Sequence, residues 1–194
     1  MDGIILVDKP RGMTSGECTR QVAGRLGAAK AGHAGSLDAN ATGLLLIALG
    51  SARKSISYFM GLDKEYVALL RLHGDIKRRD AIPALMKFTG KIIQVPPRRS
   101  RVARRPRERA IYSIRLLSLE GRDMSIRVSC EAGTYMRKLA TDLGAGLGCG
   151  AHLVGLRRTR AGPFTESDCV DIGEVSEGKV LTLKGALAML NKDK

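Results

Sequence analysis

Residues 124–144 read MSIRVSCEAGTYMRKLATDLG, and the periodicity of this stretch changes halfway along it. Over residues 124–130, apolar and polar side chains alternate, which predicts a strand with one buried and one solvent-facing side. The buried side comprises Met124, Ile126, Val128 and Cys130. From Thr134 the apolar spacing becomes helical, with Met136, Leu139, Ala140 and Leu143 on one side. A strand followed directly by an amphipathic helix is therefore the first unit of the fold.

The flanking sequence adds further strands and helices in no regular order. We expect a buried strand at residues 3–9, ended by Pro10 and Gly12, and then a helix with Thr14 or Ser15 as N-cap. The apolar run at residues 44–50 fits either a strand or a buried helix. Residues 64–75 predict a strand, residues 80–90 a short helix with Pro83 in its first turn, and residues 181–194 a helix with a frayed tail.

Strands and helices thus mix without a strict strand–helix–strand alternation, which favours an α+β fold. We expect a mixed, mostly antiparallel sheet flanked by helices, in a single domain over residues 1–194. Residues 166–194 form a less strongly patterned C-terminal extension of it.

The chain is strongly basic, with a formal net charge of +14 and a pI of about 10.1. Such an excess repels itself unless an anionic partner offsets it, and nucleic acid is the leading candidate, ahead of a membrane surface. No apolar run approaches the ~20 residues that a transmembrane helix needs, and no signal peptide opens the chain. Four cysteines without a CxxC pair and three histidines do not supply zinc-ligand spacing. We therefore expect reduced thiols, no zinc site and a cytoplasmic location.

The positive charge is densest at residues 94–112, QVPPRRSRVARRPRERAIY. A charge run is most often a solvated face. These residues, however, are arginines interrupted by prolines, and the planar guanidinium suits phosphates and stacks on bases. We expect a loop or arm that contacts the RNA backbone through Arg98, Arg99, Arg101, Arg104, Arg105 and Arg107.

A single acid, Asp38, lies in the glycine-rich stretch AGHAGSLDANATGLLLIALG at residues 31–50. A calcium loop starting at Asp38 would need a glutamate where Leu49 stands. The GLGCGA motif at residue 146 fits a dinucleotide fingerprint but follows a helix, so its glycines are better read as helix terminators. Asp38 is left as an Asx-turn acid, as a capping acid, or as a nucleophile or general base.

Five motifs, in order, resemble the TruB/dyskerin family of pseudouridine synthases: DKPRGMTS, KAGHAGSLDANATGLL, KEY, EAGTYMRKL and GAHLVGLRRTRAGPF. The resemblance covers residues 3 to about 165. It implies the pseudouridine synthase fold and a cofactor-free isomerisation of uridine within RNA, with Asp38 as the nucleophile. Whether Asp38 attacks the sugar or the base stays open. The glycine-rich setting of Asp38 is interpreted as room for a close RNA backbone.

The resemblance also implies roles for residues outside the loop. Tyr66 would stack on the flipped uracil, and Arg137 would pair with Asp38 and keep it ionised. Tyr135 and Leu156 would line the pocket, while His33 would hold the displaced nucleotide or its phosphate. From the residues alone, Tyr66 is equally a core tyrosine, Arg137 a surface helix residue and His33 an ordinary loop histidine.

The R-x-R-x-I-Y ending of the arginine run and the RLHGD sequence resemble the archaeal and eukaryotic dyskerin branch. That branch implies tRNA or rRNA as substrate, an H/ACA guide RNA and small H/ACA ribonucleoprotein proteins as partners. About thirty residues follow GPF, too few for the PUA domain usual in that branch, so guide dependence stays open. Two other hypotheses remain: a non-catalytic RNA-binding scaffold paralogue in a ribonucleoprotein, and a basic ribosome-associated protein.

Overall fold

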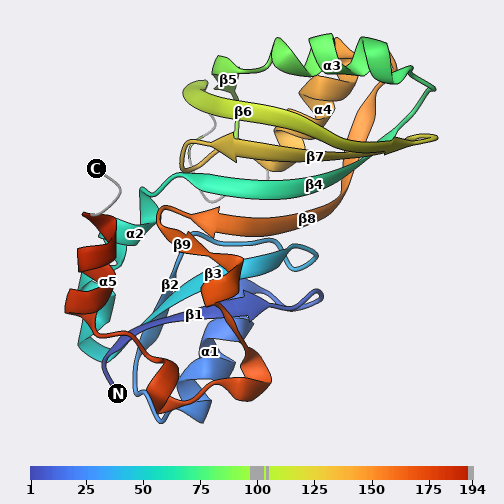
Figure 1. The fold of residues 1–194 in the computed structure, drawn as a ribbon. Helices are drawn as coiled ribbons and strands as arrows, with labels where there is room; N and C mark the ends of the chain where they lie inside the picture. Colours follow the sequence, from blue (N-terminus) through green and yellow to red (C-terminus); the bar gives the residue numbers. More distant parts are fainter. Residues whose placement is uncertain (97–102, 104, 192–194) are drawn as a thin grey trace. The chain divides into compact units, whose positions relative to one another are not determined.

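The computed structural model describes residues 1–96, 103 and 105–191 of the chain (Figure 1). These residues form two compact units. Unit 1 comprises residues 1–64 and 157–194, and unit 2 comprises residues 65–156. The chain passes between the units at the start of strand β4 (Lys64–Leu72) and within strand β8 (Ala151–Ala161).

Unit 1 is built on strands in the order β10-β1-β3-β8, with β2 paired to β3 and β9 paired to β8. The β1–β3 and β2–β3 pairs are antiparallel, whereas β3–β8 and β1–β10 are parallel. The elements are β1 (Gly3–Lys9), α1 (Ser15–Arg25), β2 (Ala31–Ala34), β3 (Thr42–Leu49), η1 (Gly50–Ser55), α2 (Ile56–Met60), β9 (Phe164–Thr165), η2 (Glu166–Asp168), β10 (Val170–Asp171), η3 (Ile172–Glu174), η4 (Glu177–Lys179) and α5 (Leu183–Leu190).

Strand β3 is buried on both of its faces. Leu44, Leu46 and Ala48 pack into a cluster that α2 and α5 cover, and the alternate residues Leu45 and Ile47 pack toward α1. A strand covered on both sides has no solvent-facing positions, so its sequence is continuously apolar rather than alternating. This explains why the run at residues 44–50 fitted a strand and a buried helix equally well.

Unit 2 has the strand order β8-β4-β7-β6-β5, and helices α3 and α4 lie on one side of it (Figure 1). The β5–β6 and β6–β7 pairs are antiparallel. Its elements besides β4 and the first half of β8 are α3 (Arg78–Met86), β5 (Gly90–Gln94), β6 (Arg107–Glu120), β7 (Asp123–Cys130) and α4 (Met136–Gly146). Alternate residues of β4 and β7 are buried together with the apolar side of α4.

The predicted α+β class, with mostly antiparallel strands, is confirmed. The alternation in residues 124–130 corresponds to β7, and all four of its apolar side chains are buried. Thr14 is the N-cap of α1 and forms a capping box with Glu17. The helix predicted from Thr134 begins at Met136, because the Thr134 hydroxyl donates to the Glu131 carbonyl in the preceding turn.

The placement of Pro83 in a first turn is wrong. Helix α3 begins at Arg78, two residues earlier than predicted, so Pro83 lies in its interior. Proline lacks an N–H, so this position cannot donate the usual hydrogen bond to the carbonyl four residues before it.

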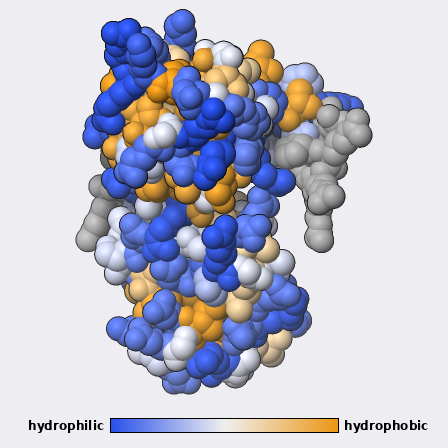
Figure 2. Space-filling view, turned by 90° about the vertical axis from the view of Figure 1, so that its right-hand side faces the viewer, coloured by the Kyte–Doolittle hydropathy of each residue, from blue (hydrophilic) through white to orange (hydrophobic). Residues whose placement is uncertain are grey.

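The surface is mostly hydrophilic on the face that Figure 2 presents, with apolar residues in small patches. The four cysteines are free thiols, of which Cys18 and Cys130 are buried. Among the described residues, no helix combines the length and apolar character that crossing a bilayer requires.

The fold predicts opposite outcomes for two glycine-to-alanine changes. At Gly43, φ is +98° and an added Cβ would lie 2.3 Å from the Arg158 carbonyl oxygen, so Gly43→Ala should destabilise the protein by about 2 kcal/mol or more. At Gly24, in α1, nothing lies within 4 Å of an added Cβ, so Gly24→Ala should stabilise by up to about 1 kcal/mol. Thermal unfolding of both variants measures the two effects. Equal shifts in melting temperature would contradict the close contact between Gly43 and the Arg158 main chain.

Candidate functional site

Asp38 lies in the loop of residues 35–41, which joins β2 to β3 in unit 1. The Asp38 carbonyl accepts a hydrogen bond from the Ala41 amide at 3.0 Å, which closes a tight turn around the acid. We call residues 35–41 the Asp38 loop. Its conformation depends on groups from three other segments of unit 1.

The first of these groups is the ammonium of Lys9, at the end of β1. Lys9 is fully buried, and its Nζ donates to the carbonyls of Pro10, Met13 and Ala39. Burial lowers the pKa of Lys9, an effect opposed by the negative charges around it, that of Asp38 among them. One buried cation therefore ties the turn after β1 to the residue that follows Asp38.

The turn after β1 and the first residue of α1 make further bonds to the Asp38 loop. The Gly12 amide donates to the Ala39 carbonyl at 2.8 Å. The buried Ser15 hydroxyl accepts from the Leu37 amide at 2.8 Å and donates to the Leu37 carbonyl at 3.1 Å. Because the residues on both sides of Asp38 are bonded in this way, its backbone is held from both directions.

His33 precedes the Asp38 loop, in β2, where it pairs with Ile47 of β3. Its Nδ1 atom is buried and has no hydrogen-bond partner among the described residues. Burial lowers the pKa of His33, and the positive charge of Arg158 lowers it further. The imidazole is therefore held neutral close to Asp38 in the sequence.

The other predicted site residues lie in unit 2. Tyr66 is in β4 and is 9% exposed, and Leu156 is in the neighbouring strand β8. Tyr135 is the N-cap of α4, and Arg137 lies in its first turn. The structure thus places His33 and Asp38 in unit 1, and it places Tyr66, Tyr135, Arg137 and Leu156 in unit 2.

A residue that sequence reasoning missed fixes the start of α4. Gln94, the last residue of β5, is 1% exposed. Its side-chain oxygen accepts from the Tyr135 amide at 2.9 Å, and its side-chain nitrogen donates to the Tyr135 carbonyl at 3.3 Å. The sequence carries no local signal for this role, because the burial of Gln94 is visible only in the structure, where its amide needs partners.

The turn before Tyr135 is held from β6. The Glu131 amide donates to the Ala110 carbonyl, and a Glu131 carboxylate oxygen accepts from the Ala110 amide at 3.0 Å. The Arg109 guanidinium lies 3.6 Å from the other Glu131 oxygen and close above Gly133. The helix start that carries Tyr135 and Arg137 is therefore supported by both β5 and β6.

Four of the arginines predicted to contact RNA, Arg98, Arg99, Arg101 and Arg104, lie outside the described residues. Arg105 lies just before β6, and Arg107 is the first residue of that strand, paired with Gln94. Arg109, which also belongs to the run, pairs with Ile92. The prediction of a loop or arm is therefore wrong at this end of the run, because strand pairing with β5 extends back to Arg107.

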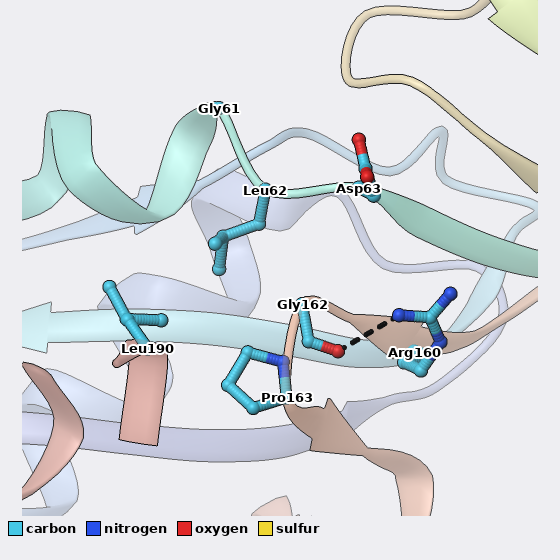
Figure 3. A pocket seen from close by; sticks show the side chains of 7 residues that line it. All are labelled: Gly61, Leu62, Asp63, Arg160, Gly162, Pro163 and Leu190. Carbon is cyan, nitrogen blue, oxygen red and sulfur yellow. Dashed lines mark hydrogen bonds between the residues drawn. The ribbon is translucent and has the colours of Figure 1, made fainter. Parts of the chain in front are cut away.

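The cavity shown in Figure 3 has a volume of about 750 Å³ and lies in unit 1. Leu62, Pro163 and Leu190 supply its apolar lining, and Arg160 donates to the Gly162 carbonyl at its edge. None of the predicted site residues lines it. Nowhere among the described residues do three or more His, Cys, Asp or Glu side chains form a group that could hold a metal ion.

Two family models match consecutive parts of the chain. Residues 23–136 match the TruB family pseudouridylate synthase N-terminal domain, and residues 137–189 match the tRNA pseudouridylate synthase B C-terminal domain. A Methanopyrus kandleri protein named probable tRNA pseudouridine synthase B is 47% identical over 91% of this chain and 52% of its own length. A Korarchaeum cryptofilum protein of the same name is 48% identical over 90% of this chain and 54% of its own. The chain spans about half the length of these curated relatives.

Solved structures agree with these matches. One chain of a Cbf5-Nop10-Gar1 complex superposes with a TM-score of 0.90 at 39% identity, covering 96% of this chain and 62% of that one. A chain of an H/ACA RNP bound to a substrate RNA superposes with a TM-score of 0.80 at 42% identity, over 89% of this chain and 51% of that one. With the motifs, both family models and these relatives in agreement, the chain belongs to the TruB family of pseudouridylate synthases.

Proposed function

We propose that this chain is the catalytic domain of an RNA pseudouridine synthase, which converts a specific uridine of tRNA or rRNA to pseudouridine. The observation that carries the proposal is that the chain belongs to the TruB family and that its motif acid, Asp38, lies on a loop with a fixed backbone. The Asp38 side chain is exposed, and the backbone on both sides of it is held by hydrogen bonds to Lys9 and Ser15. A solvent-accessible carboxylate on a fixed backbone suits a preorganised nucleophile.

The conversion is an isomerisation, so it needs no oxidant, reductant or second substrate. The bond from the ribose C1′ to uracil N1 breaks, and a bond from C1′ to uracil C5 forms. C5 loses a proton and N1 gains one, so the atoms balance. A single carboxylate suffices to hold the ribose or the base covalently while the uracil turns, and this is the role proposed for Asp38.

The residues of unit 2 supply the rest of the proposed site. A target base must leave its stack, which costs a few kcal/mol, and stacking on Tyr66 offsets much of that cost. The family resemblance assigns to Arg137 the pairing with Asp38, and to Tyr135 and Leu156 the lining of the base pocket. The neutral His33 contacts the displaced nucleotide.

The proposed partners follow from the solved relatives. Those proteins are described in complexes with Nop10, Gar1 and substrate RNA, and we extend this to the present chain as an H/ACA ribonucleoprotein subunit acting in the cytoplasm. The net charge of +14 supports an RNA partner. Dependence on a guide RNA is tested by mapping pseudouridines in total RNA treated with the chain, with and without a guide.

Asp38→Asn tests the nucleophile. It keeps the size and polarity of the side chain but removes the charge, so pseudouridine formation should stop while RNA binding persists. Mass spectrometry of treated RNA measures the product. Asp75→Asn is the control, because Asp75 is an exposed carboxylate paired with Arg122. Product formation by pure Asp38→Asn protein would refute the assignment, and RNA binding by an inactive wild-type chain would favour a scaffold.

Tyr66 should behave as a stacking platform. Tyr66→Phe keeps the ring and should keep RNA binding, whereas Tyr66→Ala should weaken productive binding by about 1–3 kcal/mol. Because Tyr66 is buried, the assay runs well below the melting temperature of each variant. Tyr58→Ala, which removes a tyrosine that is 65% exposed on α2, is the control. Equal single-turnover rates for the Phe and Ala variants would rule out stacking.

The arginine run should govern the salt dependence of RNA binding. Each phosphate contact contributes about 0.7–0.9 to the slope of log K against log salt concentration. Replacing Arg104, Arg105 and Arg107 by Ala should weaken binding and flatten this slope, with little change in melting temperature. A large loss of stability with an unchanged slope would mean that these arginines are structural.

A further inference from the structure

Arg158, in β8 of unit 1, is a buried cation to which the proposed chemistry assigns no function. Arg158 is only 1% exposed. Its Nε donates to the Leu44 carbonyl at 2.7 Å, and its Nη2 donates to the Gly35 carbonyl at 3.1 Å. A buried guanidinium costs desolvation energy, which main-chain carbonyls offset only when they are held in the right geometry.

The two carbonyls lie on either side of Asp38, one at the start of the Asp38 loop and the other in β3 just after it. Gly35 is the first residue after β2, and Leu44 is the third residue of β3. One side chain therefore reaches the backbone both before and after the loop. The guanidinium is planar and its donors have a fixed spacing. Arg158 therefore bridges the two strands joined by the loop, beyond the last β2–β3 pair at Ala34 and Leu46.

Two glycines, Gly35 at the start of the loop and Gly43 in β3 just after it, lie close to Arg158. Gly35 has φ +77°, and an added Cβ would lie 3.2 Å from Nη1 of Arg158. Gly43 has φ +98°, and an added Cβ would meet the Arg158 main chain. The backbone on either side of Asp38 is thus shaped around Arg158, as well as bonded to it.

We propose that Arg158 is a positioning residue for Asp38: by bridging the two strands that the Asp38 loop joins, it determines where the Asp38 carboxylate meets the nucleotide. This rests on the proposed function. Lys9 holds the middle of the loop at Ala39, and Arg158 holds the backbone at its start and just after it. Burial lowers the pKa of His33, and the charge of Arg158 lowers it further.

The test compares Arg158→Lys with Arg157→Lys. Lysine keeps the charge but cannot hold two carbonyls at a fixed spacing, so Arg158→Lys should lower kcat about 100-fold with KM for RNA changed less than about threefold. Arg157 is adjacent and pairs with Asp8 and Glu166, away from the loop carbonyls. Arg157→Lys should therefore cost stability without the same loss of kcat. Added guanidinium ion, at non-denaturing concentration, should restore part of the rate of Arg158→Ala.

Hydrogen exchange provides a readout that does not depend on activity. The amides of Leu37 and Ala41 are bonded within and across the loop, and both should exchange faster in Arg158→Lys than in Arg157→Lys. Unchanged exchange, or a kcat within twofold of wild type in a folded Arg158→Lys protein, would overturn the proposal. A wild-type chain that forms no pseudouridine would refute the proposed function instead. The exchange comparison would still show whether Arg158 holds the Asp38 loop in place.

Discussion

Two buried cations that bond to main-chain carbonyls are the constraint on which unit 1 depends. Lys9 lies at the end of β1 and Arg158 in β8, the strands on either side of β3 in the strand order. Neither charge can be left without acceptors in the interior without a cost of several kcal/mol. The turn after β1 and the loop before β3 must therefore close around them, because these segments supply the carbonyls. The backbone of the loop that carries Asp38 is in this sense held by the core, although Asp38 itself is exposed.

Local patterns predicted the elements well wherever one side of an element is buried and the other is wet. The alternation of Met124 and Ile126 with polar neighbours, and the capping box of Thr14 and Glu17, are complete within a few residues. The run at Leu44 was ambiguous because burial on both faces removes the alternation that distinguishes a strand. Pro83 misled because the start of α3 depends on residues before it that have no strong capping signal.

The site was predictable only in part, and the reason is physical. Asp38 stood out as a single acid in a glycine-rich loop, and the family motifs supplied the residues of unit 2. Lys9, Arg158 and Gln94 did not stand out, because charged and amide side chains are usually exposed and nothing local marks a buried one. The glycines around Asp38 were interpreted as room for RNA. In the structure, glycine is required at positions 35 and 43 because φ is positive at both and because Arg158 lies close to both.

The pair of hydrogen bonds between Gln94 and Tyr135 has a consequence for how this protein can change during evolution. A hairpin ordinarily takes its strand register from its connecting residues, and a slip by one residue reverses the face of every side chain. In unit 2, a slip of β5 would turn Gln94 away from Tyr135, so a third element holds the β5–β6 register. Lengthening a connection costs little, about 0.6 kcal/mol per doubling. A change in the length of the connection between Gln94 and Arg107 should therefore leave the β5–β6 register in place, because that register does not depend on the connection alone.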